Sequence, residues 1–134
     1  MTHHASGSFE VKLNPLPLHW QEDTAGLGRM SIDKQFQGGL SGVSRGEMLS
    51  AMTSMKGSAG YVAIEHVSGT LNGLDGSFAL QHSGTMTRGA PQLSVSVVPD
   101  SGTGRLVGLE GTMTIDIVDG KHSYQFEYSL PGDD

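Results

Sequence analysis

The sequence predicts a single all-β domain folded as a small antiparallel barrel of about eight strands. Apolar and polar residues alternate along most of the chain, which is the period of a strand with one buried face. The 20 glycines are spread between these alternating segments, as is typical of turns, bulges and bends in a curved sheet. Without predicted helices to cover them, the strands must bury their apolar faces against one another, in a barrel or, alternatively, in a two-layer sandwich.

The first two predicted strands lie at residues 8–13 and 30–36. Phe9 and Val11 alternate with polar residues in the first strand, and Ile32 does so in the second. Residues 14–27 between them contain two prolines and a tryptophan, so we expect a loop there that covers one end of the barrel.

The remaining strands follow one another with turn signals between them. Asp119–Gly120 is the strongest signal, because these residues supply the positive φ angles of a two-residue hairpin. Such a turn pairs Ile115 with Tyr124 and Met113 with Phe126, so the apolar faces of both strands coincide. We read Met30, Met86 and Met113 as core residues. The predicted strands are 43–53, 58–71, 76–87, 93–97, 112–117 and 122–129.

Length and composition exclude several classes of protein. A chain of 134 residues fits one domain over residues 1–134, and the absence of cysteine excludes thiol catalysis and disulfide frameworks. The net charge is -6 and the basic residues are scattered, so we expect no nucleic-acid partner. No apolar stretch approaches the roughly 20 residues of a membrane helix, so we expect no membrane partner and a cytoplasmic location.

The sequence offers no motif for a metal site or a phosphate-binding loop. His66, His82 and His122 lie on separate predicted strands, without the short spacings of zinc sites, so we expect no metal. Ser101 lies in a turn between Asp100 and Gly102, where the glycines suit the backbone, and the Gly102-x-Gly104 pair does not open a helix that could bind phosphate. We therefore expect no cofactor.

Four stretches are more specific than periodicity. They are Gly46–Glu47–Met48, GSAGYVAIE at 57–65, GSFALQHSGTM at 76–86 and PDSGTGRLVGLEG at 99–111. Together they resemble the bacterial family labelled domain of unknown function 3224 over nearly the whole chain. That family implies no settled activity.

A weaker motif lies within the last of these stretches. The Ser101–Gly104 turn, followed by Leu106, Gly108 and Gly111, is similar to a motif of allene oxide cyclases and plant dirigent proteins. The resemblance implies an eight-stranded barrel of the allene oxide cyclase type, which often holds an apolar ligand. It carries no catalytic residue onto this chain.

Polar residues on predicted apolar faces mark candidate binding groups, because their burial costs free energy unless they are paired. Lys34, His82 and His122 occupy such positions. Each lies near a barrel rim or is satisfied by a neighbouring residue, or else the three line a pocket.

Hairpin parity adds a carboxylate to this set. A loop centred on Gly73–Leu74 would place Glu65 directly opposite His82, whereas a three-residue loop with a bulge would turn Glu65 to the other face. The resulting candidate ligand-binding residues are Glu65, His82, Tyr61, Phe78, Lys34 and His122.

These observations favour a small-molecule-binding barrel with an apolar lumen, in which a carboxylate and an imidazole could serve an isomerase or cyclase activity on a hydrophobic substrate. The alternative is a non-enzymatic structural or interaction protein with a side-chain-filled barrel that self-associates. Methyl-bearing residues on both faces of the 58–67 strand predict a homo-oligomer, such as a dimer.

Overall fold

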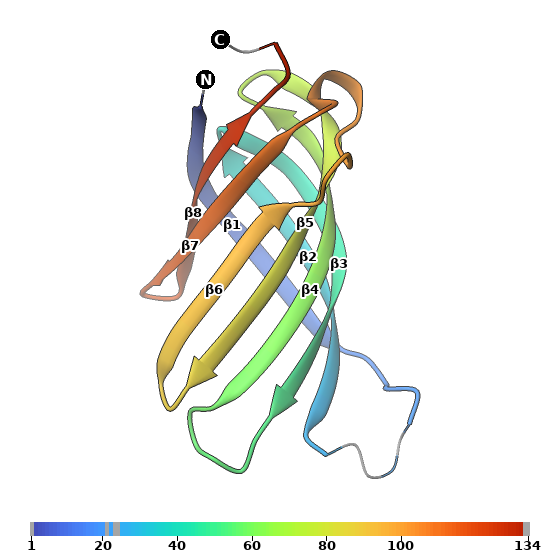
Figure 1. Cartoon of the computed structure of the whole chain (residues 1–134), viewed down its shortest axis with the longest axis vertical. Helices are drawn as coiled ribbons and strands as arrows, with labels where there is room; N and C mark the ends of the chain where they lie inside the picture. The colour runs from blue at the N-terminus through green and yellow to red at the C-terminus, as the bar shows by residue number, and fades with distance from the viewer. Residues whose placement is uncertain (1, 21, 23–24, 133–134) are drawn as a thin grey trace.

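The computed structural model describes residues 2–20, 22 and 25–132, and this part of the chain forms one closed antiparallel barrel (Figure 1). The barrel confirms the predicted all-β class and excludes the two-layer sandwich. Besides the strands, the described residues contain one short 3-10 helix, η1 (Gly104–Leu106). The strands are β1 (His3–Pro15), β2 (Leu27–Gly38), β3 (Leu40–Met52), β4 (Ala59–Leu71), β5 (Leu74–Thr87), β6 (Ala90–Val97), β7 (Glu110–Val118) and β8 (Lys121–Ser129).

Each strand pairs with the next in sequence, and β8 pairs with β1 to close the barrel. The predicted β7–β8 hairpin is confirmed, since Ile115 pairs with Tyr124 and Met113 with Phe126. Its turn has the positive φ angles that were expected, 52° at Asp119 and 77° at Gly120. Local turn chemistry and the apolar alternation therefore select the same register.

The two ends of the barrel differ. The start of β1, the end of β8, η1 and the β2–β3 and β4–β5 hairpins lie at one end, which we call the termini end (Figure 1). The described residues of the 16–26 loop and the hairpins β3–β4, β5–β6 and β7–β8 lie at the other end, the loop end (Figure 1). Buried apolar side chains fill the termini end, where Phe78 stacks on Phe126 with ring centroids 5.9 Å apart and η1 contributes Leu106.

Most of the predicted interior residues belong to one core. Phe9, Phe78, Val95 and Phe126 are members of one buried cluster, and half-buried Ile115 packs against it. Ile32 is also buried but is not a member of that cluster. The interpretation of three methionines as core is wrong for Met86, which is exposed near the loop end of β5, although it pairs with Ala59 and Pro91 on the neighbouring strands. Met113 is buried and Met30 is half-buried.

Tyr124 ties the barrel wall to the β2–β3 hairpin. Its hydroxyl lies 2.9 Å from the Leu40 N–H, which donates to it, and 2.9 Å from the Gln37 carbonyl, which accepts from it. Gly7 faces this contact, and a Cβ there would lie 1.9 Å from the Gln37 oxygen and 2.8 Å from the Tyr124 hydroxyl. Only glycine lets β1 pass so close to the hairpin.

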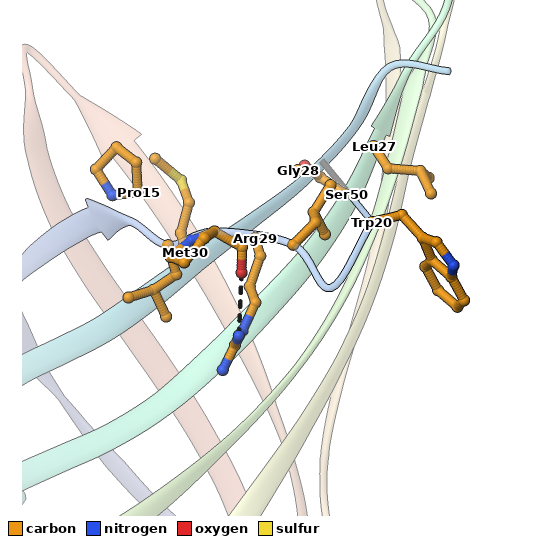
Figure 2. Close-up of a pocket in the computed structure, with 10 residues that line it drawn as sticks. Pro15, Trp20, Leu27, Gly28, Arg29, Met30 and Ser50 are labelled. Carbon is orange, nitrogen blue, oxygen red and sulfur yellow. Dashed lines mark hydrogen bonds between the residues drawn. The ribbon is translucent and has the colours of Figure 1, made fainter. Parts of the chain in front are cut away.

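The loop between β1 and β2 lies beside the loop end of the barrel. Trp20 is 73% exposed and Leu27 is also exposed, so the expectation that this loop covers the barrel is wrong for its described residues. It borders a cavity of about 490 Å³ against β2 and β3, where Arg29 donates to the Pro17 carbonyl at 3.2 Å (Figure 2). The expectation of a covering loop rests partly on the two prolines, which restrict the backbone of the loop but do not direct it toward the barrel interior.

No helix of the described residues is long and apolar enough to cross a membrane.

Candidate functional site

A cluster of polar side chains lies inside the barrel, about halfway along its length. Lys34, Ser44, Glu65 and His82 come from the consecutive strands β2, β3, β4 and β5. Buried and exposed residues alternate with the strand period around each of them. This alternation shows that each side chain points into the barrel. All four are buried, and Glu65 is completely inaccessible at 0%. We call these residues the buried ion cluster.

Glu65 is the centre of the buried ion cluster. Its Oε2 atom accepts hydrogen bonds from Lys34 Nζ at 2.8 Å and from His82 Nε2 at 2.5 Å. Its Oε1 atom accepts from Ser44 Oγ at 2.8 Å. In the described part of the chain, no buried side-chain nitrogen or oxygen lacks a hydrogen-bond partner. The cluster is therefore fully satisfied, as a buried charge must be if it is not to destabilise the fold.

The charge state of Glu65 follows from these contacts. Burial by itself would raise the pKa of the carboxyl group, but the His82 hydrogen bond and the charge and hydrogen bond of Lys34 lower it from 4.5 to about 2. Glu65 is thus an anion at neutral pH and can only accept hydrogen bonds. His82 Nε2 must therefore carry a proton, and in the neutral ring Nδ1 then carries the lone pair.

Glycine makes room for the carboxylate. Gly46 of β3 pairs directly with Glu65, and a Cβ at this glycine would lie 2.6 Å from Glu65 Cα and 2.1 Å from the Ile64 carbonyl oxygen. Real Cβ atoms essentially never come so close to backbone atoms. This close approach gives a physical role to Gly46 in the Gly46–Glu47–Met48 stretch.

Two aromatic rings surround the Lys34 ammonium group. Its Nζ atom lies 4.7 Å from the centre of the Phe9 ring and 5.7 Å from the centre of the Phe36 ring. Such contacts are worth about 2 kcal/mol or more when the cation is desolvated. The rings therefore compensate part of the cost of removing the lysine from water.

Tyr61 lies next to the buried ion cluster on the loop-end side. Its ring centroid is 6.4 Å from that of His82, and the ring packs over Gly84, where a Cβ would lie 2.4 Å from Tyr61 Cε1. Burial, and then the negative charge of Glu65, raise the pKa of Tyr61 above its usual 10.0. The hydroxyl is therefore a neutral phenol at physiological pH and can donate a hydrogen bond.

Two polar atoms at this position remain available. Neither the Tyr61 hydroxyl nor His82 Nδ1 hydrogen-bonds to another described residue. Every fully buried side-chain nitrogen or oxygen of the described residues has a hydrogen-bond partner, so these two atoms are not fully buried. Both atoms therefore keep contact with solvent. The site therefore has one phenolic hydroxyl and one imidazole nitrogen that bind no other described residue.

The structure brings together four of the six predicted site residues, Lys34, Glu65, His82 and Tyr61. Phe78 is buried in the core of the termini end against Phe126 and lies outside this group.

His122 is also outside the group, although an aromatic ring connects it indirectly. His122 is half-buried near the loop end of β8, and its ring centroid lies 5.1 Å from that of Phe9. The Phe9 ring in turn contacts the Lys34 ammonium group. Ser44 was not predicted, because serine occurs on either face of a strand and gives no burial signal in the sequence.

The predicted register of the β4–β5 hairpin is wrong by two residues. Its turn is Asn72–Gly73, with φ of 47° and 87°, so Glu65 pairs with Leu80 and His82 pairs with Ala63. Asn-Gly is the preferred sequence for such a two-residue turn, which is why it forms in place of a turn at Gly73–Leu74. Because a shift of two residues preserves the face, Glu65 and His82 still meet as diagonal neighbours inside the barrel.

In the described part of the chain, no group of three or more His, Asp or Glu side chains is placed to hold a metal ion. Within the buried ion cluster the Lys34 ammonium group already neutralises the carboxylate. The absence of a bound metal stays a prediction, which elemental analysis of the purified protein would check.

Comparison with known proteins identifies the family. The family model described as protein of unknown function (DUF3224) matches residues 5–128. The chain belongs to the DUF3224 family. It is also similar to a solved structure of a DUF3224-family protein of unknown function from Shewanella oneidensis MR-1, with 50% sequence identity, a TM-score of 0.93, and coverage of 99% of this chain and 100% of that one. No curated protein is similar enough to this DUF3224 chain to match it.

Proposed function

We propose that this DUF3224 protein binds a small, mainly apolar, uncharged molecule in the loop-end half of its barrel, with a polar group of that molecule against Tyr61 and His82. One observation carries the proposal: a phenolic hydroxyl and an imidazole nitrogen, both without a protein partner, adjoin a fully satisfied buried ion cluster. A few placed polar groups in an apolar cavity are typical of small-molecule sites.

The burial pattern supports this location. Inward-facing residues of the termini end are almost completely buried, whereas Val11, Met30, Met48 and Tyr61, which face inward toward the loop end, are only half-buried. The inward-facing side chains are therefore less buried in the loop-end half than at the termini end. An apolar ligand in the loop-end half would remove these partly exposed side chains from water, which is favourable.

The charges favour an uncharged ligand. The Lys34 and Glu65 charges neutralise each other at 2.8 Å, so the cluster offers no spare ion to pair with a charged group. The chain as a whole carries a net charge of -6, which disfavours an anion. A hydroxyl or carbonyl group matches the available donor and acceptor.

The same geometry would suit proton transfer on such a ligand. Glu65 orients His82 through Nε2, so the Nδ1 lone pair would act as a general base, and Tyr61 would donate a hydrogen bond to the ligand oxygen that gains negative charge. Isomerisation of a hydrophobic carbonyl compound is the reaction class that needs this pair of groups.

Binding of an uncharged fluorescent dye tests the proposal. We expect the neutral dye Nile red to bind the wild-type protein, and Tyr61→Phe to weaken binding about threefold to tenfold, because a single hydrogen bond is worth roughly 0.5–1.5 kcal/mol. Fluorescence titration gives the Kd. Because the Tyr61 hydroxyl makes no bond within the described chain, the free energy of unfolding should stay unchanged within about 0.5 kcal/mol.

The matched control is Tyr128→Phe, the same substitution at the termini end, where the hydroxyl accepts from Asn72 at 2.7 Å. This variant should lose stability and keep the dye affinity. Equal dye affinity in wild type and Tyr61→Phe would contradict the proposed position of the polar group. Failure of Nile red to bind the wild-type protein would contradict the proposed function itself.

A second candidate function is self-association through the outer wall of the barrel. Leu49 and Val62 are direct cross-strand partners on β3 and β4, and with Ile64 they form an exposed surface that we call the outer apolar patch. A groove of about 580 Å³ runs over it, lined in part by Arg29 and Glu47, which pair at 2.7 Å. Because a positive and a negative side chain flank the patch, two copies can associate through it about a two-fold axis. Arg29 of each copy would then pair with Glu47 of the other.

Sedimentation of two matched variants tests self-association. We expect the wild-type protein to sediment as a dimer at high micromolar concentration and Val62→Lys to sediment as a monomer, because a lysine in the centre of an apolar interface has no partner. Val43→Lys, at a residue of similar exposure (49% against 53%) away from the patch, should remain a dimer. A monomeric wild-type protein would exclude this function.

A further inference from the structure

The barrel wall is incompletely paired between β6 and β7. In the described residues these strands share only the pairs Val95–Met113 and Ser96–Thr112, whereas β6 pairs with β5 along its whole length and β7 with β8 along its whole length. Continuing the register would pair Leu93 with Ile115, but the strands separate before this point and diverge toward the loop end (Figure 1). We call the unpaired region between residues 90–94 and 114–118 the β6–β7 seam.

Inward-facing residues become exposed where the pairing stops. Val95 is 2% exposed, but Leu93, the next inward residue of β6, is 43% exposed. On β7, Met113 is buried, Ile115 is half-buried and Ile117 is 63% exposed. The seam is therefore bordered by partly exposed apolar side chains from both strands.

The seam begins at the level of the candidate site. Val95, in the last closed pair, is the cross-strand partner of His82. Leu93, the first open position, is the partner of Gly84, which in turn pairs with Tyr61. The two available polar atoms of the site thus lie one or two strands away from the point where the wall opens.

We propose that the β6–β7 seam is the binding groove for the apolar body of the ligand, whose uncharged polar group reaches Tyr61 and His82. This inference rests on the proposed function and adds to it the shape of the ligand: an elongated apolar molecule with a hydroxyl or carbonyl group at one end. Leu93, Ile115 and Ile117 would contact the body, and the site at the closed apex of the seam would bind the polar end.

A small molecule suits the seam better than an added β-strand. A strand inserted between β6 and β7 would need them about twice the usual 4.8 Å strand spacing apart along its whole length. The seam is a wedge, since its strands are hydrogen-bonded at Val95–Met113 and separate only gradually from there. A molecule that is narrow at its polar end fits this shape.

Single cysteine variants test the seam, because the natural chain contains no cysteine. Leu93→Cys places a thiol on the inner side of β6 at the seam, and Ser94→Cys places one on the outer side of the same strand. Each variant is alkylated with N-ethylmaleimide with and without Nile red. At a dye concentration about ten times its Kd, we expect alkylation of Leu93→Cys to slow about tenfold, because only the dye-free protein reacts.

Ser94→Cys should react at the same rate with and without the dye. Fully alkylated Leu93→Cys should bind Nile red at least about tenfold more weakly, whereas alkylated Ser94→Cys should bind it as the wild type does. Suppose that the wild type binds the dye and that Tyr61→Phe weakens this binding. If the dye then does not slow alkylation of Leu93→Cys, and alkylation does not lower its dye affinity, the seam is not the binding groove and the proposed function still holds. If the wild type binds no dye, both fail.

Discussion

Replacement of Glu65 by glutamine is expected to lower the free energy of unfolding by about 3–5 kcal/mol, as is found when one partner of a buried ion pair is removed. Glutamine has nearly the same shape, so the substitution leaves no cavity in the barrel. What it removes is the negative charge that holds the Lys34 ammonium group and the His82 ring. Lys34 would then be a buried cation without a counter-ion.

Urea denaturation followed by circular dichroism measures this effect. The control is Glu47→Gln, which makes the same chemical change in an exposed ion pair with Arg29 and should cost less than about 1 kcal/mol. Lys34→Met in the Glu65→Gln background removes the unpaired cation and should restore part of the lost stability, giving a coupling energy of about 1 kcal/mol or more. A loss in Glu65→Gln no larger than that in Glu47→Gln would show that the cluster does not stabilise the fold.

These expectations divide the site into two parts with different roles. Glu65, Lys34 and Ser44 hold one another and contribute to stability, so their substitution affects folding before it affects binding. The Tyr61 hydroxyl has no protein partner, so Tyr61 is the residue through which binding can change while stability stays constant, whereas His82 also hydrogen-bonds to Glu65 through Nε2. A ligand study on this protein should therefore begin with Tyr61.

The barrel could be predicted because turn chemistry and apolar alternation agree in its hairpins. Asp119–Gly120 determines the register of β7 and β8, and the alternation of Tyr124 and Phe126 confirms it independently. The split between β6 and β7 could not be predicted, because Leu93 and Ile115 continue the alternation of their strands as if they were paired. Whether two neighbouring strands separate depends on the twist and closure of the whole barrel.

The candidate site could be predicted in part from the cost of buried polar groups. Lys34 and His82 stand out as polar residues on apolar faces, and hairpin parity places Glu65 on the same inner wall even with the turn misplaced by two residues. Phe78 and His122 share that wall but lie at other heights along the barrel axis. Strand periodicity indicates which face a residue occupies, and height depends on the stagger between strands.

Acidic pH should weaken the fold through Glu65. Its pKa is about 2 in the folded protein, below its ordinary 4.5, so the unfolded chain binds the proton more tightly. The stabilisation is therefore fully present above about pH 5 and is lost progressively as the pH falls toward about 2. A lowering from 4.5 to about 2 corresponds to about 3 kcal/mol, since each unit of pKa is worth about 1.4 kcal/mol.

Other carboxyl groups also titrate in this range, so the informative quantity is the difference in unfolding free energy between the wild type and Glu65→Gln. Measured by urea denaturation from about pH 6 down to about pH 2.5, this difference should shrink by roughly 2–3 kcal/mol, because protonated Glu65 is as uncharged as glutamine. The control pair, wild type and Glu47→Gln, should show a nearly constant difference, since that carboxylate is exposed. A constant difference between wild type and Glu65→Gln would mean that the folded protein does not hold Glu65 preferentially as an anion.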